Sequence, residues 1–270
     1  MPFEIAIDPK WFIAVALSSM VFGLLSPLVV SRKMLFLAGS LPHSALLSVL
    51  LAIILNRVLG VPSELGSLLA SVALVYFLSL MISRGIKVDV ATAIFLSLTL
   101  SFTSFSLYYI LTSFPIRESI WSYFVGDPLL VTWEDLSYAS MVSSLTLALL
   151  LPSMRKQVLI GADRDFARIS GVRVELYDGI AVITLAIASV GLLKITGFVL
   201  EHILILIPGV TAASIARNLK SFLTYAFILS LLGGLGGLML SLLTGLAPSG
   251  CVGLILLSFY LASLMGRCSR

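Results

Sequence analysis

Long apolar segments separated by short polar ones account for most of this chain. Nine of them approach the ~20 residues that a helix needs to cross the hydrocarbon of a bilayer. The predicted spans cover residues 11–30, 34–55, 64–83, 89–112, 135–152, 177–193, 195–214, 220–244 and 249–266. The pattern therefore predicts an all-α, polytopic transmembrane bundle of eight or nine helices, some of them broken by proline or glycine.

Composition excludes an ordinary soluble protein. Of the 270 residues, 59% are hydrophobic and 11% are charged, whereas soluble domains carry about 25% charged residues. The polar loops are too short for a soluble domain of ~50 residues. We therefore expect one transmembrane domain over residues 1–270, with any motor or capture domain on another chain. Basic residues occur singly or in pairs in the loops, which argues against nucleic-acid binding.

The distribution of basic residues predicts the orientation in the membrane. If the loop after the first span is cytoplasmic, thirteen of the 17 Lys and Arg residues lie on the cytoplasmic side, as the positive-inside rule requires. The first ten residues lack the basic region and cleavage site of a signal peptide. We expect a multi-pass protein of the cell membrane with its N-terminus outside and its C-terminus in the cytoplasm.

Three ionisable residues lie well inside the predicted spans. Glu201 is the only acid away from the span ends, and His43 and His202 are the only histidines. A carboxylate at mid-membrane costs roughly 3 kcal/mol, so such a residue is first treated as functional. Carboxylate and imidazole suit zinc, manganese or ferrous iron, which makes these three the candidate metal ligands. Hydrogen bonding between helices is the alternative.

Neighbouring positions on a helix differ in direction by roughly 100°. Glu201 and His202 therefore cannot both point into one narrow pore. One of the two is expected to hold the other in place or to bond a neighbouring helix.

Prolines lie next to these polar residues. Pro42 deprives the Ala38 carbonyl of its helical partner, and Pro208 does the same to Leu204. We predict helix breaks at Pro42 and at Pro208-Gly209. Broken helices beside ionisable groups are typical of ion sites in transporters, although a packing kink would look the same in sequence.

The longest cytoplasmic loop, at about 153–176, contains a short helical pattern. Asp163 is suited to cap a helix over DRDFARISG, and Gly171 to end it. Such a mixed-charge helix on the inner face is a natural contact for a soluble partner. On the outer side, the aromatic residues Trp121, Tyr123, Phe124 and Trp133 predict an interfacial helix.

Small residues recur in the eighth span. Gly233, Gly237 and Ser241 fall on one helix face. Such residues let two helices approach closely. We expect the contact to lie within the subunit rather than between two copies.

Four stretches carry a family resemblance. They are RKMLFLAGSLPHSALLSV, VGDPLLVTWEDL, ADRDFARISGVRV and KITGFVLEHILILIPGVTAASIAR. In this order, and over nearly the whole chain, the sequence resembles the membrane-spanning permease subunits of ABC transporters that import zinc, manganese or iron(II).

The resemblance implies a pore made by two permease copies, either a homodimer or a pair with a paralogue. It also implies a cytoplasmic ABC ATPase, which binds the ATP, and a metal-capturing solute-binding protein outside. The permease would carry a divalent metal, bind no covalent cofactor and have no enzymatic activity of its own. His43 would line the metal path. The residues expected to couple to the ATPase are Asp163, Asp165, Phe166, Ala167, Arg168 and Gly171.

One position departs from the resemblance. Many members have an aspartate four residues before the second-span histidine, where this chain has Gly39. In turn, Glu201 and His202 stand where many relatives have valine, serine or alanine. We hypothesise that Glu201 replaces the missing carboxylate from across the pore.

Two other functional classes remain open from the sequence. A stand-alone cation channel or an ion-coupled secondary carrier is the main alternative. An intramembrane metalloenzyme is less favoured, because Glu201-His202 is followed by Ile-Leu-Ile-Leu and does not form the HExxH spacing that places two ligands on one helix face.

Overall fold

The computed structural model describes residues 8–113 and 128–268, and helices account for nearly all of them. The elements are α1 (Pro9–Ser31), α2 (Leu35–Leu59), α3 (Ser63–Ser83), α4 (Val88–Ser113), the 3-10 turn η1 (Pro128–Leu130), α6 (Trp133–Ala162), α7 (Arg164–Ile169), α8 (Val174–Ile215), α9 (Leu219–Thr244) and α10 (Pro248–Cys268). Within these ranges, eight helices are long and apolar enough to cross a membrane. The predicted all-α, polytopic bundle is confirmed.

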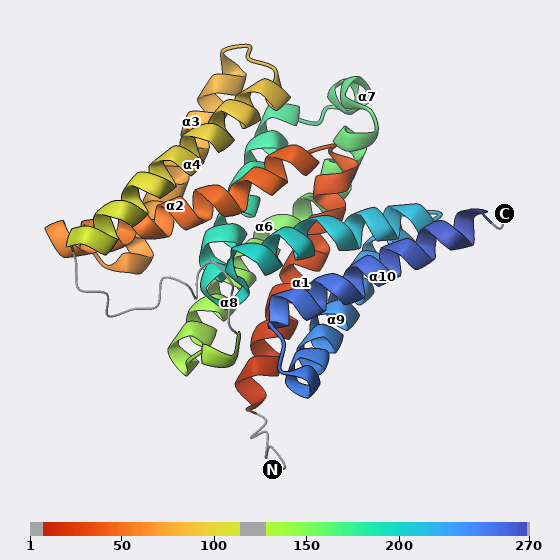
Figure 1. Ribbon diagram of the computed structural model, residues 1–270. Coiled ribbons are helices and arrows are strands. Elements are labelled where there is room, and N and C mark those ends of the chain that lie inside the picture. Colours follow the sequence, from red (N-terminus) through yellow and green to blue (C-terminus); the bar gives the residue numbers. More distant parts are fainter. Residues whose placement is uncertain (1–7, 114–127, 269–270) are drawn as a thin grey trace.

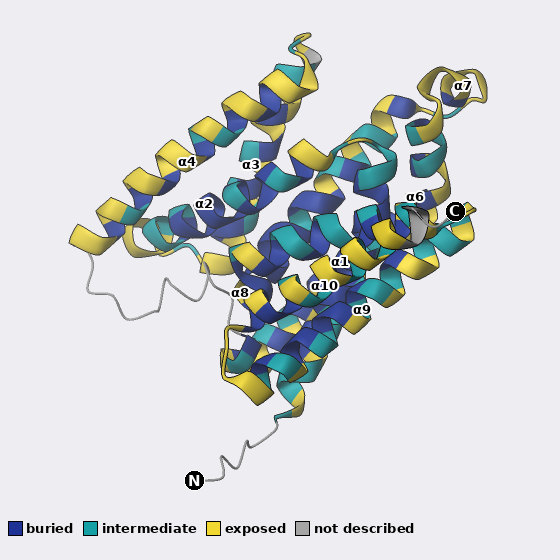
Figure 2. Ribbon diagram, turned by 45° about the vertical axis from the view of Figure 1, so that its right-hand side comes forward, coloured by how far each residue is buried: buried dark blue, intermediate teal, exposed yellow. Residues whose placement is uncertain are grey.

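Helix α1 lies at the centre of the bundle, packed against α6, α8 and α9 (Figure 1). Helix α2 joins α3 and α4 to this centre through its contact with α8, and α10 covers α8 and α9. Figure 2 shows which parts of the helices are exposed in the single chain. Large apolar residues are among the exposed ones, for example Leu69 (67% exposed) and Phe105 (74% exposed). Apolar residues on the outside as well as the inside are what a lipid surrounding requires.

Helix α8 changes direction in its middle. Its 42 residues would reach about 63 Å if straight, roughly twice the thickness of the hydrocarbon layer. Gly197 alone within α8 has non-helical torsion angles, φ 64° and ψ 164°. This backbone conformation is essentially restricted to glycine. Gly197 therefore divides α8 into a first arm and a second arm.

The first arm runs from one end of the bundle to the other. Near its beginning, Asp178 binds Arg32, which directly follows α1. At its end, the ammonium of Lys194 lies 2.6 Å from a carboxylate oxygen of Asp135 in the first turn of α6. Because α6 runs antiparallel to α1, these two ion pairs mark opposite ends of the bundle.

The second arm brings the chain back (Figure 1). The Gly209 amide donates to Ser26 Oγ, in the last third of α1, at 2.8 Å. Farther along, Ser214 Oγ lies 2.8 Å from Ser263 Oγ near the end of α10. The predicted spans 177–193 and 195–214 are thus two antiparallel arms of one helix, joined without a loop.

The prolines do not break their helices. Pro42 lies inside α2 and Pro208 inside the second arm of α8, and both helices continue past them. The predicted breaks at Pro42 and at Pro208-Gly209 are therefore corrected to a single reversal at Gly197. A proline removes one hydrogen bond but keeps a helical φ, whereas the torsion angles of Gly197 leave the helical region altogether.

Helix α6 is longer than the sequence pattern predicts. It continues through Pro152 to Ala162, so the predicted loop at about 153–176 consists of the end of α6, the short helix α7 and the links around them. Of the predicted interfacial residues, Trp121, Tyr123 and Phe124 lie outside the described ranges, and Trp133 is the exposed first residue of α6.

Small residues bring α9 close to α10. A Cβ on Gly233 would lie 2.3 Å from a Leu256 methyl carbon, and one on Gly237 would lie 2.4 Å from the Val252 Cα. The predicted small-residue contact is confirmed within the subunit. Ser241 instead bonds the Leu246 carbonyl, at 2.5 Å, in the turn after α9.

The reversal at Gly197 generates a first prediction. Substitution of Gly197 by alanine places a Cβ in a conformation that costs about 1–3 kcal/mol for other residues. We expect a lower apparent melting temperature in detergent. It is measured by circular dichroism or by the fluorescence of a reporter dye that does not react with thiols. Gly179→Ala on the first arm is the matched control, because no atom lies within 4 Å of its added Cβ. An equally stable Gly197→Ala protein would contradict the assigned reversal.

Candidate functional site

The two histidines meet between α2 and the second arm of α8. The ring centroids of His43 and His202 lie 5.4 Å apart. Phe198 contacts both rings, at 4.6 Å from His43 and 4.5 Å from His202. All three side chains are half-buried. Residues separated by about 160 positions thus form one aromatic cluster, which reaches the surface of the single chain.

Both ring nitrogens of His202 lie against carbonyl oxygens. Nδ1 is 2.9 Å from the Phe198 carbonyl, and Nε2 is 2.8 Å from the Gly39 carbonyl. A neutral imidazole has one N–H and can donate to only one of them. A metal can bind only a nitrogen with an available lone pair, so metal binding by His202 requires the ring to leave one carbonyl.

His43 is not held in this way. Within the described part of the chain, neither of its ring nitrogens has a hydrogen-bond partner. Nitrogen–metal distances of about 2.0–2.1 Å place two imidazole rings on one ion with centroids roughly 5 Å apart. The observed separation of His43 and His202 is of this size. The pair could therefore share one ion after a rotation of the His202 ring.

Glu201 does not join the histidines. Its side chain is 0% exposed and lies beside Ser189 of the first arm, so it occupies the interface between the two arms of α8. Neither carboxylate oxygen, nor the Ser189 hydroxyl, has a hydrogen-bond partner of good geometry in the described residues. Within those residues, no group of three or more His, Cys, Asp and Glu side chains could hold a metal ion.

There is open space beside Gly39, the position at which many family members have an aspartate. A Cβ on Gly39 would meet no atom within 4 Å. Glu201 does not enter this space in the observed conformation, because it points toward Ser189. Replacement of the missing carboxylate by Glu201 during function therefore stays a prediction, and in this conformation it is His202 that lies beside His43.

Ser26 of α1 occupies the position beside Pro208. Its hydroxyl accepts from the Gly209 amide at 2.8 Å and donates to the Leu206 carbonyl at 3.4 Å. The Pro208-Gly209 step is buried against α1 and is a packing contact in this structure. Sequence reasoning missed Ser26, because its partner lies about 180 residues away and a serine inside an apolar span gives no specific signal.

The short helix α7 matches its prediction closely. Asp163 Oδ1 accepts from the Asp165 and Phe166 amides at 3.0 and 2.9 Å. After the helix, Gly171 has a positive φ of 79°. Asp163 and Gly171 thus fix both ends of α7, as expected from their local hydrogen-bonding and torsional preferences.

One residue anchors α7 while others project from it. Ala167 is 0% exposed and packs with Ile160 and Val174. Phe166 is 56% exposed and Ile169 is 86% exposed, so α7 presents apolar surface at one end of the bundle (Figure 2). Ile169 is not among the predicted coupling residues, although it follows Phe166 closely on the same short helix.

Arg168 of α7 is tied to the beginning of α8. Its guanidinium lies 2.6 Å from a carboxylate oxygen of Glu175. The bond to Glu175 raises the pKa of Arg168, and both side chains are exposed. An ion pair of this kind contributes little to stability, so Arg168 remains available to a partner.

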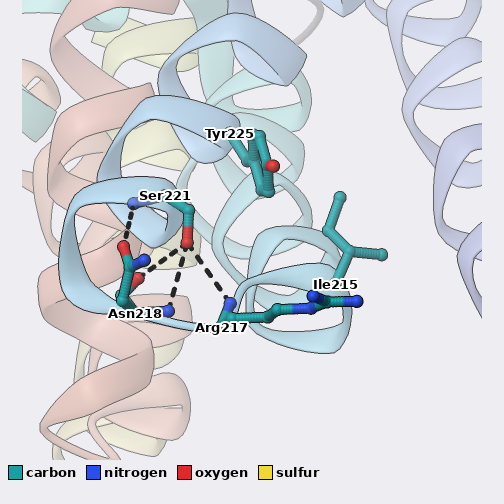
Figure 3. Close-up of a pocket in the computed structure, with 5 residues that line it drawn as sticks. All are labelled: Ile215, Arg217, Asn218, Ser221 and Tyr225. Atoms are coloured by element: carbon teal, nitrogen blue, oxygen red, sulfur yellow. Dashed lines mark hydrogen bonds between the residues drawn. The ribbon is translucent and has the colours of Figure 1, made fainter.

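A separate pocket of about 300 Å³ lies at the turn between α8 and α9 (Figure 3). It is lined by Ile215, Arg217, Asn218, Ser221 and Tyr225. Asn218 and Ser221 form a capping box for α9, with Oδ1 of Asn218 accepting from the Ser221 amide at 2.8 Å. These polar groups serve the helix end, and the pocket contains none of the candidate metal ligands.

Comparisons with known proteins agree with this architecture. The chain is 26% identical over 223 residues to the "High-affinity zinc uptake system membrane protein ZnuB" of Haemophilus influenzae, covering 83% of each chain. It is 27% identical over 239 residues to the protein of the same name from Buchnera aphidicola subsp. Acyrthosiphon pisum, covering 87% of each.

Among solved structures, the fold resembles "PsaBC from Streptococcus pneumoniae in complex with Fab". The TM-score is 0.80 at 20% identity, covering 94% of this chain and 89% of that chain. The model of the family described as "ABC 3 transport family" matches residues 7–267, nearly the whole sequence. This chain is therefore a membrane protein of the ABC 3 transport family.

Proposed function

We propose that this chain is the pore-forming permease subunit of an ATP-binding-cassette importer of divalent transition-metal ions, namely zinc, manganese or iron. The observation that carries the proposal is the half-buried pair His43 and His202 inside the apolar bundle. The two imidazoles lie at a distance suited to one ion. They are potential metal ligands inside a bundle whose other side chains are mainly apolar.

A transient contact suits transport better than a closed site. Conduction requires binding that is favourable enough for entry and weak enough for release. Only two imidazoles meet here, and one of them is held by carbonyl oxygens. His43 receives the ion first in this proposal, and His202 joins after it leaves the Gly39 carbonyl. Glu201 is the third proposed path residue and would contribute only if the second arm of α8 turned it away from Ser189.

The path needs a second permease copy. The two rings are half-buried at the surface of a single chain, and a divalent ion between them would otherwise face lipid. A second copy, identical or a paralogue, would close the path between the two subunits. The names of the curated relatives, which describe zinc uptake, support zinc among the three candidate metals.

The remaining partners follow from the two ends of the bundle. An ABC ATPase would dock on the exposed apolar residues of α7 at the cytoplasmic end, with Asp163, Asp165, Phe166, Ala167, Arg168 and Gly171 forming or supporting that contact. A metal-capturing solute-binding protein would deliver the ion at the opposite end. The excess of basic residues near α7 supports a cytoplasmic C-terminus and an N-terminus outside.

Removal of either imidazole should strongly reduce metal uptake. The permease is reconstituted in proteoliposomes with its ATPase and its solute-binding protein, and ATP-dependent uptake of zinc, manganese and ferrous iron is measured. We expect His43→Ala and His202→Ala each to reduce uptake of the preferred metal at least about tenfold, the loss expected for a contact of more than 1.4 kcal/mol. Metal flux without ATP would instead support a stand-alone channel or a secondary carrier.

Glu201→Gln separates a transport role from a structural one. A neutral amide is less costly to bury than an unpartnered carboxylate, so we expect an equal or higher apparent melting temperature. The role in the path predicts loss of uptake in the same well-folded variant. Full uptake by Glu201→Gln would assign the residue to the interface between the arms of α8.

Phe166→Ala tests the docking helix. Truncation of an exposed aromatic anchor typically costs an interface 1 kcal/mol or more. We expect weaker co-purification of the ATPase and loss of ATP-driven uptake, with an unchanged melting temperature. Phe105→Ala is the control, since Phe105 is the same residue type, is even more exposed (74%), and lies on α4, far along the chain from α7. Normal coupling in Phe166→Ala would remove α7 from the proposed interface.

A further inference from the structure

We propose that Asp178 is the positioning residue through which movement of α7 reaches the two helices that carry His43 and His202. The inference rests on the proposed function, because it assigns α7 as the docking site of the ATPase. Asp178 is not one of the predicted coupling residues.

Asp178 joins three elements with one carboxylate. Its Oδ1 accepts from Nη2 of Arg32, and its Oδ2 accepts from Nη2 of Arg164. Arg32 lies between α1 and α2, Arg164 is the first residue of α7, and Asp178 itself lies in the second turn of α8. Each oxygen thus holds a different neighbour, which a neutral or single-acceptor side chain could not do.

The Arg32 side of this bridge is the buried side. The Arg32 side chain is 5% exposed, compared with 50% for Arg164. Burial lowers the pKa of Arg32, and the nearby Asp178 opposes this effect. Breaking a buried pair leaves an uncompensated charge and is far more costly than breaking an exposed one. Asp178 is therefore fixed to the α1–α2 junction and offers its second oxygen to α7.

The surroundings of Asp178 form a packed block. Gln157 of α6 donates to the Tyr177 carbonyl at 2.8 Å. A Cβ on Gly161 would lie 2.3 Å from the Ser31 carbonyl oxygen, so the end of α6 touches the end of α1. The ends of α1 and α6 and the beginning of α8 are held together, and α7 extends from this block.

The connections beyond the block lead to both imidazoles. Three residues after Arg32, α2 begins and carries His43 in its third turn. Asp178 lies on the first arm of α8. The second arm of the same helix, which follows the reversal at Gly197, carries His202. A displacement of α7 by a bound ATPase would pull Arg164, and through Asp178 it would reach α2 and α8 together. The other ion pair between α7 and α8, Arg168–Glu175, lacks a connection of this kind to α2.

The test is the amount of metal transported per ATP. Zinc uptake and ATP hydrolysis are measured in proteoliposomes that contain the permease with its ATPase and solute-binding protein. For Asp178→Asn we expect the ATPase to stay bound and hydrolysis to stay within about twofold of wild type, while zinc uptake per ATP falls about tenfold, within the usual range of coupling between sites.

Matched variants separate coupling from folding. Arg164→Gln leaves the buried Arg32–Asp178 pair intact and should lower uptake per ATP as Asp178→Asn does, and the double variant should be no worse than Asp178→Asn alone. Asp178→Glu should recover part of the uptake. Glu175→Gln, which removes only the exposed pair, should transport as wild type does.

Different experimental results would reject the role of Asp178 and the proposed importer function. Normal zinc uptake per ATP in Arg164→Gln and Asp178→Asn rejects the role of Asp178. Loss of the ATPase from both variants, with hydrolysis and uptake falling in parallel, also rejects it in favour of a docking role. A wild-type complex without ATP-driven zinc or other metal uptake rejects the proposed function itself.

Discussion

The reversal of α8 at Gly197 is the constraint on which the rest of the site depends. A helix of 42 residues cannot lie straight within one apolar layer, and backbone groups inside such a layer must find partners within the protein. One glycine with φ 64° and ψ 164° reverses the chain without a polar loop. Both arms then pack against α1, and the second arm is brought against α2.

This geometry separates two residues that are adjacent in sequence. His202 faces α2, where it meets His43 and the Gly39 carbonyl. Glu201 faces the first arm and Ser189, and its side chain is 0% exposed. Helical geometry requires such a divergence of about 100°, and the antiparallel arms decide which residue faces which neighbour. The face of the second arm toward α2 therefore carries imidazole rather than carboxylate, a donor type that suits zinc and iron.

Ion pairs join the helices at both ends of the bundle, and different pairs of helices are joined at each end. At the α7 end, the ion pairs of Asp178 and Glu175 connect helices that are close in sequence, and Arg32 brings in the α1–α2 junction. At the opposite end, Lys194 and Asp135 hold the first arm of α8 against α6. A bundle of apolar helices has few directional contacts, so a handful of ion pairs and serine–backbone bonds fixes its register.

The sequence by itself determined the features that depend on local physical chemistry. Apolar spans of about 20 residues predicted the helices, and Asp163 with Gly171 located α7 to within a residue or two. The orientation inferred from charge asymmetry stays a prediction. Only the tertiary structure decided where α8 reverses, where Glu201 points, and that Ser26 and Asp178 have partners. Both prolines looked like helix breaks, yet the break is at Gly197, because a proline still allows helical torsion angles when neighbouring helices support it. Partners such as Ser26 and Gly209, about 180 residues apart, are chosen by packing in three dimensions, which hydropathy and capping patterns do not encode.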